Sequence, residues 1–147
     1  MKPTTSSRST KHKKNANGKF TLKINEIEQV YEQYQYILKV PAGGLMSAGK
    51  HIGPGDSDID AIYISYPNAV VVDKEYNWTY PDDVIGLPEK WALHYQGVRY
   101  IAITGKQTAT FKTLHKHITG HVSFDGKEEN GTKTIKVSGD FELTTDP

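Results

Sequence analysis

The sequence predicts a mainly β protein, either an antiparallel β-sandwich or a barrel-like domain of about 8–9 short strands. Apolar and polar residues alternate with a period of two over many short stretches, as they do in strands with one buried face. The chain also holds 13 glycines and seven prolines, many of them between these stretches, where such a fold needs turns. Nine tyrosines, four phenylalanines and two tryptophans indicate a folded core, because disordered chains are poor in aromatic residues.

The first third of the chain gives two strands and one ambiguous stretch. Residues 20–24 alternate between apolar and polar side chains, and an Asn25-Glu26 turn follows them. Residues 26–33 are ambiguous because their apolar residues also fall at helical spacing, so at most one short helix is expected there. Residues 34–40 alternate again and contain two tyrosines and a closing valine, which favours a strand.

The rest of the chain has a clearer strand pattern, with turn signals between the strands. These signals are Gln96-Gly97, Gly105-Lys106 and a loop at 125–131 that contains both Asp-Gly and Asn-Gly. Ser138-Gly139 predicts a bulge in the last stretch. The end of the chain resembles the paired terminal strands of many small bacterial β-sandwich domains, which supports the fold class. The expected strands are 59–66, 69–72, 91–95, 98–104, 108–114, 118–124, 132–137 and, beyond the bulge, 141–143.

Charge divides the chain into a basic tail at residues 1–18 and a single β-domain at residues 19–147. The formal net charge is +1, yet no acidic residue precedes Glu26, so the tail is basic and the domain mildly acidic. The tail holds almost nothing apolar after Met1 and is expected to be disordered. Nucleic acid is therefore not an expected partner except through this tail. The tail also fits an arm for anionic lipid, or the leader of an exported effector or surface protein.

The composition excludes several classes of site. The chain has no cysteine, which rules out disulfides, thiolate metal ligands and a cysteine nucleophile. No stretch approaches about 18 consecutive apolar residues, so no transmembrane segment is expected. The N-terminus lacks the apolar stretch of a secretory signal peptide. The default expectation is a cytoplasmic protein, and export without a classical signal peptide is the alternative.

Two long segments rich in glycine, proline and polar residues, 41–56 and 73–90, are expected to be loops that form a recognition surface. Flat aromatic side chains in and beside the second segment suit stacking on a sugar ring, with a carboxylate nearby to bond its hydroxyls. The same rings also fit ordinary core packing. The candidate ligand-binding residues are Tyr76, Trp78, Tyr80, Asp82 and Trp91, and the expected partner is a carbohydrate or a protein.

The acidic run Asp56, Asp58 and Asp60 is the first candidate metal site. If this segment is extended, the three carboxylates share one face, and a hard cation such as Ca²⁺ or Mg²⁺ relieves their repulsion. The run does not fit the EF-hand template, because Ala61 stands where that loop needs glycine. The alternative is a solvated entry to a strand, in which these residues cap a turn.

The acidic run is also part of a pattern that resembles the nucleotidyltransferase family. Gly43-Gly44 precedes Asp58-Ile59-Asp60 and the apolar residues 62–64, as a Gly-Gly turn precedes an Asp-x-Asp strand in that family. The resemblance covers about 20 residues and implies that Asp58 and Asp60 hold magnesium for nucleotidyl transfer, with Asp73 as a third carboxylate. The family places a helix between the glycines and the acids, whereas glycines and a proline occupy that space in this chain.

The histidines His115, His117 and His121 are the second candidate metal site. On a continuous strand they share one face, and imidazoles two residues apart suit zinc. The alternative is that they are polar residues on the solvent face of an antiparallel sheet. Apart from such a divalent cation, no cofactor is expected.

The leading hypothesis for function is a non-catalytic binding or interaction module of unknown ligand. A metal-dependent enzyme that uses Asp58 and Asp60 is the main alternative, and an exported effector or surface protein is the second. Nucleophilic catalysis and P-loop nucleotide binding lack their motifs, because neither Gly-x-Ser-x-Gly nor GxxxxGK[ST] occurs.

Overall fold

The computed structural model describes residues 14–55 and 58–145, which form ten strands and one short 3-10 helix. All strand pairings among these residues are antiparallel. The predicted fold class is confirmed. Within the described residues, no helix is long and apolar enough to cross a membrane. The elements are β1 (Ala16–Ile24), β2 (Ile27–Tyr31), β3 (Gln33–Val40), β4 (Gly43–His51), β5 (Ile59–Pro67), β6 (Glu75–Tyr80), η1 (Asp82–Val84), β7 (Ala92–Tyr95), β8 (Val98–Thr113), β9 (His117–Glu128) and β10 (Thr134–Thr145).

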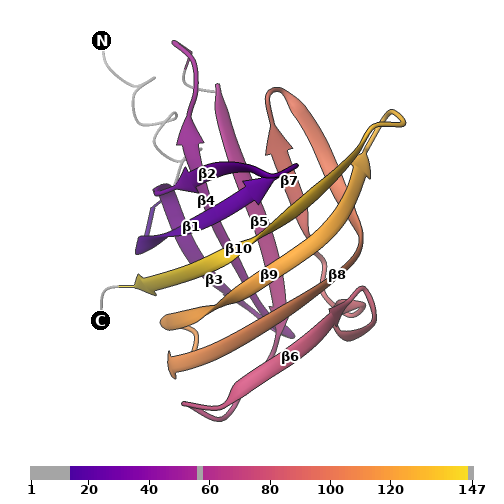
Figure 1. Cartoon of the computed structure of the whole chain (residues 1–147). Coiled ribbons are helices and arrows are strands. Elements are labelled where there is room, and N and C mark those ends of the chain that lie inside the picture. The colour runs from indigo at the N-terminus through magenta and orange to yellow at the C-terminus, as the bar shows by residue number, and fades with distance from the viewer. Residues whose placement is uncertain (1–13, 56–57, 146–147) are drawn as a thin grey trace.

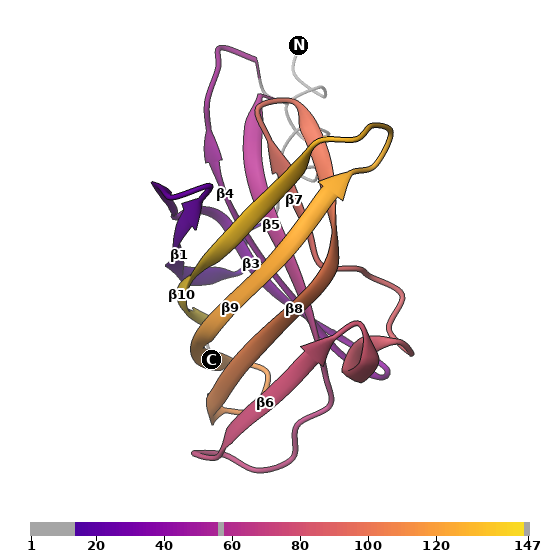
Figure 2. The same ribbon diagram turned by 45° about the vertical axis from the view of Figure 1, so that its right-hand side comes forward.

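The strands form one sheet that curls until its two ends nearly meet, which gives a barrel-like shape (Figures 1 and 2). The order across the sheet is β2-β1-β10-β9-β8-β7-β5-β4-β3, and β6 pairs with β8 outside this path. In Figure 1 the long strands β8, β9 and β10 cross in front of β3, β4 and β5. The two groups of strands therefore face each other across a common interior.

Asn15, the residue before β1, joins the two ends of the sheet by hydrogen bonding to β3. Its backbone N–H donates to the Gln35 carbonyl at 2.9 Å. Its side-chain oxygen accepts from the Ile37 N–H at 2.9 Å, and its side-chain amide donates to the Ile37 carbonyl at 3.0 Å. Gln35 Nε2 donates to the Gly18 carbonyl at 2.6 Å. Side-chain amides thus satisfy backbone groups of β3 and β1 where no strand ladder joins the two strands.

The inward side chains of the strands form one continuous apolar core. Along β10, buried Ile135, Val137, Phe141 and Leu143 alternate with polar outward residues, as a strand with one buried face requires. Trp91 is fully buried, and its indole N–H donates to the Ser65 carbonyl at 2.8 Å. The core thus satisfies the one polar group of its largest side chain.

Part of the predicted loop at 41–56 is strand β4, and its small residues explain why. Seven consecutive residues of β4, Gly43 to Gly49, are buried, and most of them are small. At Gly44 an added Cβ would lie 2.2 Å from Cζ of Tyr66, so a larger residue would force that buried ring to shift. The small residues therefore allow β4 to lie between β3 and β5 in the sheet. The prediction of a loop over residues 43–51 is wrong.

Other local predictions also differ from the structure. Residues 27–31 form strand β2 in place of a short helix, and the predicted loop at 73–90 contains β6 and η1. Residues 69–72 form no strand, and Val70 is 78% exposed. Gly105-Lys106 lies inside the continuous strand β8, and Ser138-Gly139 pairs with β9 in unbroken register, without a bulge.

Two of the predicted turns are confirmed by their backbone geometry. Asn25 and Glu26 have φ of 49° and 71°, and Gln96 and Gly97 have φ of 52° and 81°. Left-handed conformation at both central positions is typical of tight hairpin turns. Most of the predicted tail, residues 1–13, lies outside the described residues, and β1 begins at Ala16, earlier than the predicted start of the domain at residue 19.

Candidate functional site

The aromatic residues predicted to bind a ligand lie in or against the core. Trp78, Tyr80 and Trp91 are 8%, 6% and 0% exposed. Trp78 stacks between Tyr76 and Tyr66, with ring centroids 5.2 and 6.2 Å away, and Tyr80 lies against Trp91 at 4.8 Å. Their faces are covered by other rings, which agrees with the core-packing interpretation of these residues. The remaining candidate of this group, Asp82, is exposed at the start of η1.

The described acidic residues of the run 56–60 have separate roles, and Asp56 lies outside the described residues. Asp58 Oδ2 accepts a hydrogen bond from the Gly55 N–H at 3.0 Å, as a turn cap does. Asp60 is buried, and its Oδ1 accepts from the Gln96 N–H at 2.8 Å. Burial raises the pKa of Asp60, and the hydrogen bond from Gln96 acts in the opposite direction. Across the described ranges, no group of three or more His, Asp or Glu residues is placed to hold a metal ion.

The structure departs from the nucleotidyltransferase pattern at the point where that family has a helix. Gly43-Gly44 begins β4, which pairs directly with β5, so the glycines and Asp60 belong to one hairpin. Asp73 lies in a turn on the surface, where its carboxylate pairs with Lys112 at 3.4 Å. The strand β4 explains why the glycines and the acids do not reproduce the arrangement of that family.

The three histidines have separate partners. His115 lies in the turn between β8 and β9, with Nδ1 3.1 Å from the Tyr66 hydroxyl oxygen. Burial lowers the pKa of His115. His117 and His121 point outward from β9, and each pairs with a carboxylate of β10, at 2.6 and 2.9 Å. The latter two agree with the interpretation as polar residues on a solvent face.

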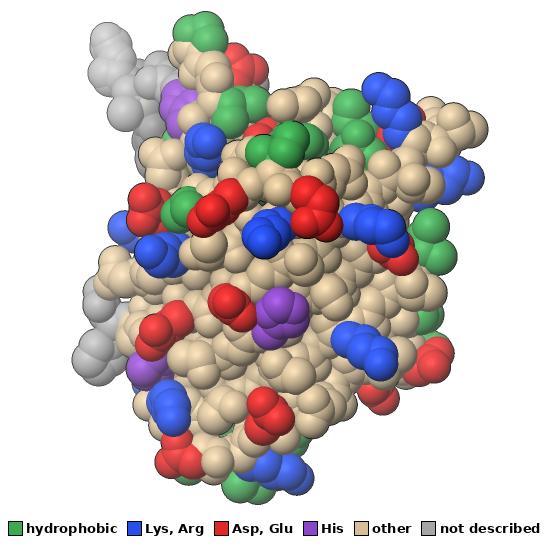
Figure 3. Space-filling model, viewed as in Figure 1, with side chains coloured by type: hydrophobic (Ala, Val, Ile, Leu, Met, Phe, Trp, Pro, Cys, Tyr) green, Lys and Arg blue, Asp and Glu red, His purple; other side chains and the backbone are tan. Residues whose placement is uncertain are grey.

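A broad polar surface lies on the outward side of β6, β9, β10, β1 and the part of β8 from Thr104 onward, and we call it the polar face. All outward side chains of these strands are polar, because they alternate with the core residues. Figure 3 shows much of this face, with acidic and basic side chains interspersed among uncharged groups. Its hydroxyl-bearing residues include Thr21, Thr79, Thr104, Thr108, Thr110, Thr119, Ser123, Thr134, Ser138 and Thr144.

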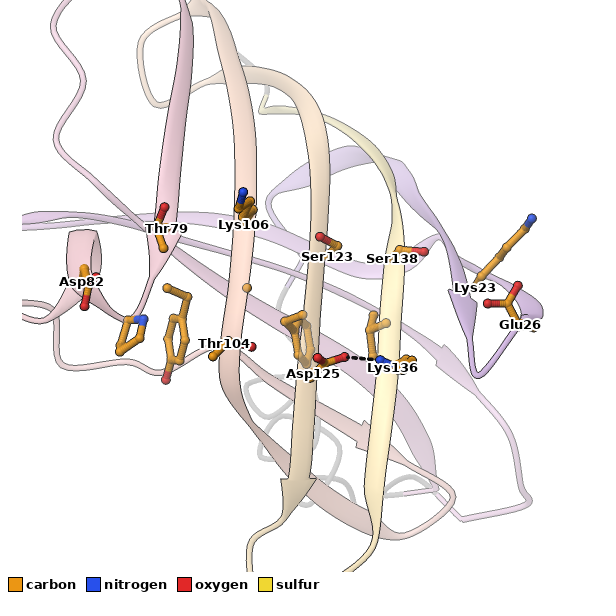
Figure 4. A pocket seen from close by; sticks show the side chains of 15 residues that line it. Lys23, Glu26, Thr79, Asp82, Thr104, Lys106, Ser123, Asp125, Lys136 and Ser138 are labelled. Carbon is orange, nitrogen blue, oxygen red and sulfur yellow. Dashed lines mark hydrogen bonds and ion pairs between the residues drawn. The ribbon is translucent and has the colours of Figure 1, made fainter.

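A groove of about 600 Å³, which we call the first groove, crosses the polar face (Figure 4). The turn at η1 stands at one end and the β1–β2 hairpin at the other. Tyr80, Phe124 and Val137 also line the groove, and their side chains are buried and belong to the core. One row along the groove is Thr79, Lys106, Ser123, Ser138 and Lys23, which are successive register partners across five strands. The second row is Asp82, Thr104, Asp125, Lys136 and Glu26.

Several polar groups of the first groove are unengaged. Lys136 Nζ and Asp125 Oδ1 form an ion pair at 3.1 Å. Among the described residues, Lys23 and Lys106 make no ion pair, and the hydroxyls of Ser123 and Ser138 make no hydrogen bond. Two ammonium groups therefore flank two hydroxyls along a row that spans three strand spacings of about 4.8 Å each.

Comparison with known proteins identifies no relative: no protein-family model matches the chain, and no curated protein or solved structure matches it significantly.

Sequence reasoning named only Tyr80 and Asp82 among the residues of the first groove, and the Tyr80 side chain is buried. The sequence analysis did not use the polar positions of the alternating pattern, which indicate the side chains that point outward from each strand. Lysine and hydroxyl residues occupy the outward positions of the strands, but their alignment into one row depends on register between segments far apart in sequence.

Proposed function

We propose that the protein is a non-catalytic binding module that holds a carbohydrate in the first groove. One observation carries this proposal: the groove measures about 600 Å³, and Lys23, Lys106, Ser123 and Ser138 in it have no side-chain partner within the described residues. That volume suits a small ligand or part of a longer one. Unengaged ammonium and hydroxyl groups on a rigid sheet are suited to hydrogen bonding with the hydroxyls of a sugar.

The composition of the first groove supports a carbohydrate over other classes of ligand. Apart from Pro81, its outward side chains are all polar, whereas the centre of a protein interface is usually rich in apolar and aromatic groups. Three lysines and three carboxylates line it, so it lacks the excess positive charge that binds nucleic acid. No outward aromatic ring lines it, so recognition would rest on hydrogen bonds rather than on stacking.

The positions of the carboxylates support binding without catalysis. Asp125 is paired with Lys136, while Asp82 and Glu26 stand at opposite ends of the groove (Figure 4). Glycosidases place two carboxyl groups on either side of one bond, about 5–10 Å apart. Each of these carboxylates can accept a hydrogen bond from a bound sugar, but the two do not face a common bond.

The test is a ¹H–¹⁵N NMR titration with hexasaccharides of cellulose, chitin, alginate and chitosan. At least one of the four probes is expected to give saturable shifts in the amides of residues 104–106, 123–125 and 136–138. Lys106→Gln should weaken that binding by about tenfold, which is the loss of one charged hydrogen bond. Lys112→Gln is the matched control, because Lys112 lies on the same strand and face but outside the groove. Binding of none of the four probes, or shifts confined to other surfaces, overturns the proposal.

A further inference from the structure

Two more grooves lie on the polar face beyond the first. The second groove measures about 330 Å³ and the third about 390 Å³. The second and third grooves share Lys19 and Glu142, so they are continuous with each other. The second groove is lined by Lys19, Thr21, Thr119, Gly120, Asp140, Phe141 and Glu142. The third is lined by Asn17, Gly18, Lys19, Glu32, Gln35, Glu142 and Thr144.

The first groove crosses five strands, and the last two of them, β10 and β1, also line the second and third grooves. These two strands lie side by side in Figure 1. On β10, Lys136 and Ser138 line the first groove, Asp140 and Glu142 the second, and Glu142 and Thr144 the third. On β1, the order is Lys23, then Thr21 and Lys19, then Lys19 and Asn17. We call this line of grooves the track. From Lys136 to Thr144 it extends for about 27 Å, at about 3.4 Å per residue.

On β10 and β1 the first and second grooves are one outward step apart, and on β9 His121 lies between Ser123 of the first groove and Thr119 of the second. Ser138 and Asp140 are successive outward residues of β10, and Ser123 and His121 are successive outward residues of β9. His121 and Asp140 pair at 2.9 Å, and their side chains are 51% and 83% exposed. This pair is accessible from the surface, so it offers hydrogen-bonding groups to a molecule that lies across both grooves.

Charges of both signs are interspersed along the track. On β1 the charged residues are Lys23 and Lys19, and their register partners on β10 are Ser138 and Glu142. Asp140 lies between Ser138 and Glu142 on β10. A polymer that carries one sign of charge would meet repulsion at some of these positions, whereas an uncharged polymer meets donors and acceptors throughout.

We infer that the ligand is a linear, uncharged polysaccharide that lies along the track, with the β10–β1 end of the first groove and the second and third grooves as successive subsites. This inference rests on the proposed function and adds to it the length, direction and charge of the ligand. A hexasaccharide contacts more than one groove, whereas a disaccharide occupies the first groove alone, since that groove is the largest of the three.

The first test is the dependence of affinity on chain length and charge, measured by isothermal titration calorimetry. The probes are the disaccharides and hexasaccharides of cellulose and chitin, with those of alginate and chitosan as charged comparators. For cellulose or chitin, the hexasaccharide should bind at least about tenfold more tightly than the disaccharide, because the added units reach further subsites. That affinity should change little with salt concentration, because the ligand is uncharged.

The second test uses a variant at the far end of the track. Asn17→Ala, in the third groove, should weaken binding of the neutral hexasaccharide and leave binding of the disaccharide unchanged. Asn77→Ala is the matched control, because Asn77 lies outward on β6 of the polar face and lines none of the three grooves. It should change neither affinity.

Each failure has a distinct meaning. Equal affinity for disaccharide and hexasaccharide, preference for a charged chain, or an unaltered hexasaccharide affinity in Asn17→Ala overturns this inference and leaves the proposed function standing. Binding of no probe of any length overturns the proposed function and this inference with it.

Discussion

Replacement of Asn15 by alanine should open the junction between β1 and β3 and lower the free energy of unfolding. The substitution removes two hydrogen bonds to Ile37, at 2.9 and 3.0 Å, and keeps the backbone bond from Asn15 to Gln35. Ile37 is 4% exposed, so water cannot readily replace the lost partners. Each bond contributes about 0.5–1.5 kcal/mol net, so the expected loss is about 1–3 kcal/mol. For a domain of this size, that corresponds to a fall in Tm of about 3–5 °C per kcal/mol.

The assay is urea unfolding followed by far-ultraviolet circular dichroism, together with amide hydrogen exchange of Ile37. Asn17→Ala is the stability control, because the Asn17 side chain is exposed and makes no hydrogen bond within the described residues. In Asn15→Ala, exchange of the Ile37 amide should accelerate more than exchange in the centre of β9. If Asn15→Ala and Asn17→Ala unfold at the same urea concentration, Asn15 does not join the ends of the sheet and the reasoning fails.

Two further predictions concern the interior. Because the folded-state pKa of His115 is lowered, the unfolded chain binds the proton more readily, so stability should fall as the pH drops below the ordinary value of 6.5. His115→Gln should reduce this loss of stability between pH 7 and pH 5, measured by urea unfolding. An unaltered pH dependence would show that His115 does not cause the loss. Gly44→Ala should cost about 1–3 kcal/mol, because the new Cβ meets the Tyr66 ring. The control Gly86→Ala meets nothing within 4 Å, and equal unfolding midpoints for the two variants would refute the packing argument.

The fold class could be predicted from the sequence because it depends on local patterns. Alternation of apolar and polar residues marks most of the strands, and short polar dipeptides mark the turns at Asn25-Glu26 and Gln96-Gly97. Both signals act over a few residues, so one sequence is enough to detect them.

Strands rich in small residues could not be predicted in the same way. Glycine and alanine are usually depleted in strands, and β4 consists largely of such residues. Gly44 is required by the Tyr66 ring, which belongs to β5 more than 20 residues later. Tertiary packing therefore determines that residues 43–51 form a strand, although their local propensity disfavours one. The same holds for Gly105, which lies within β8 against Phe124 and Trp91.

The candidate site could not be predicted because its residues become neighbours only through the register between strands that are distant in the sequence. The sequence indicates which residues of a strand point outward, but it does not show which outward residues of two distant strands are neighbours. Lys23 and Ser138 are register partners although 115 residues separate them in the chain. The aromatic residues named as ligand-binding candidates, Trp78 and Trp91, instead help to form the core beneath the sheet.

The core determines the alignment of the track. Phe20 and Phe141 are register partners on β1 and β10, and their buried rings stack with centroids 5.1 Å apart. Because side chains alternate along a strand, this inward pair places Thr21 opposite Asp140 and Lys19 opposite Glu142 on the outward side. A slip of one residue would expose the phenylalanines and bury the polar row, so the apolar pair opposes any other alignment. Substitutions at Phe20 or Phe141 should therefore alter stability and ligand binding together, whereas outward substitutions such as Asn17→Ala should alter binding at constant stability.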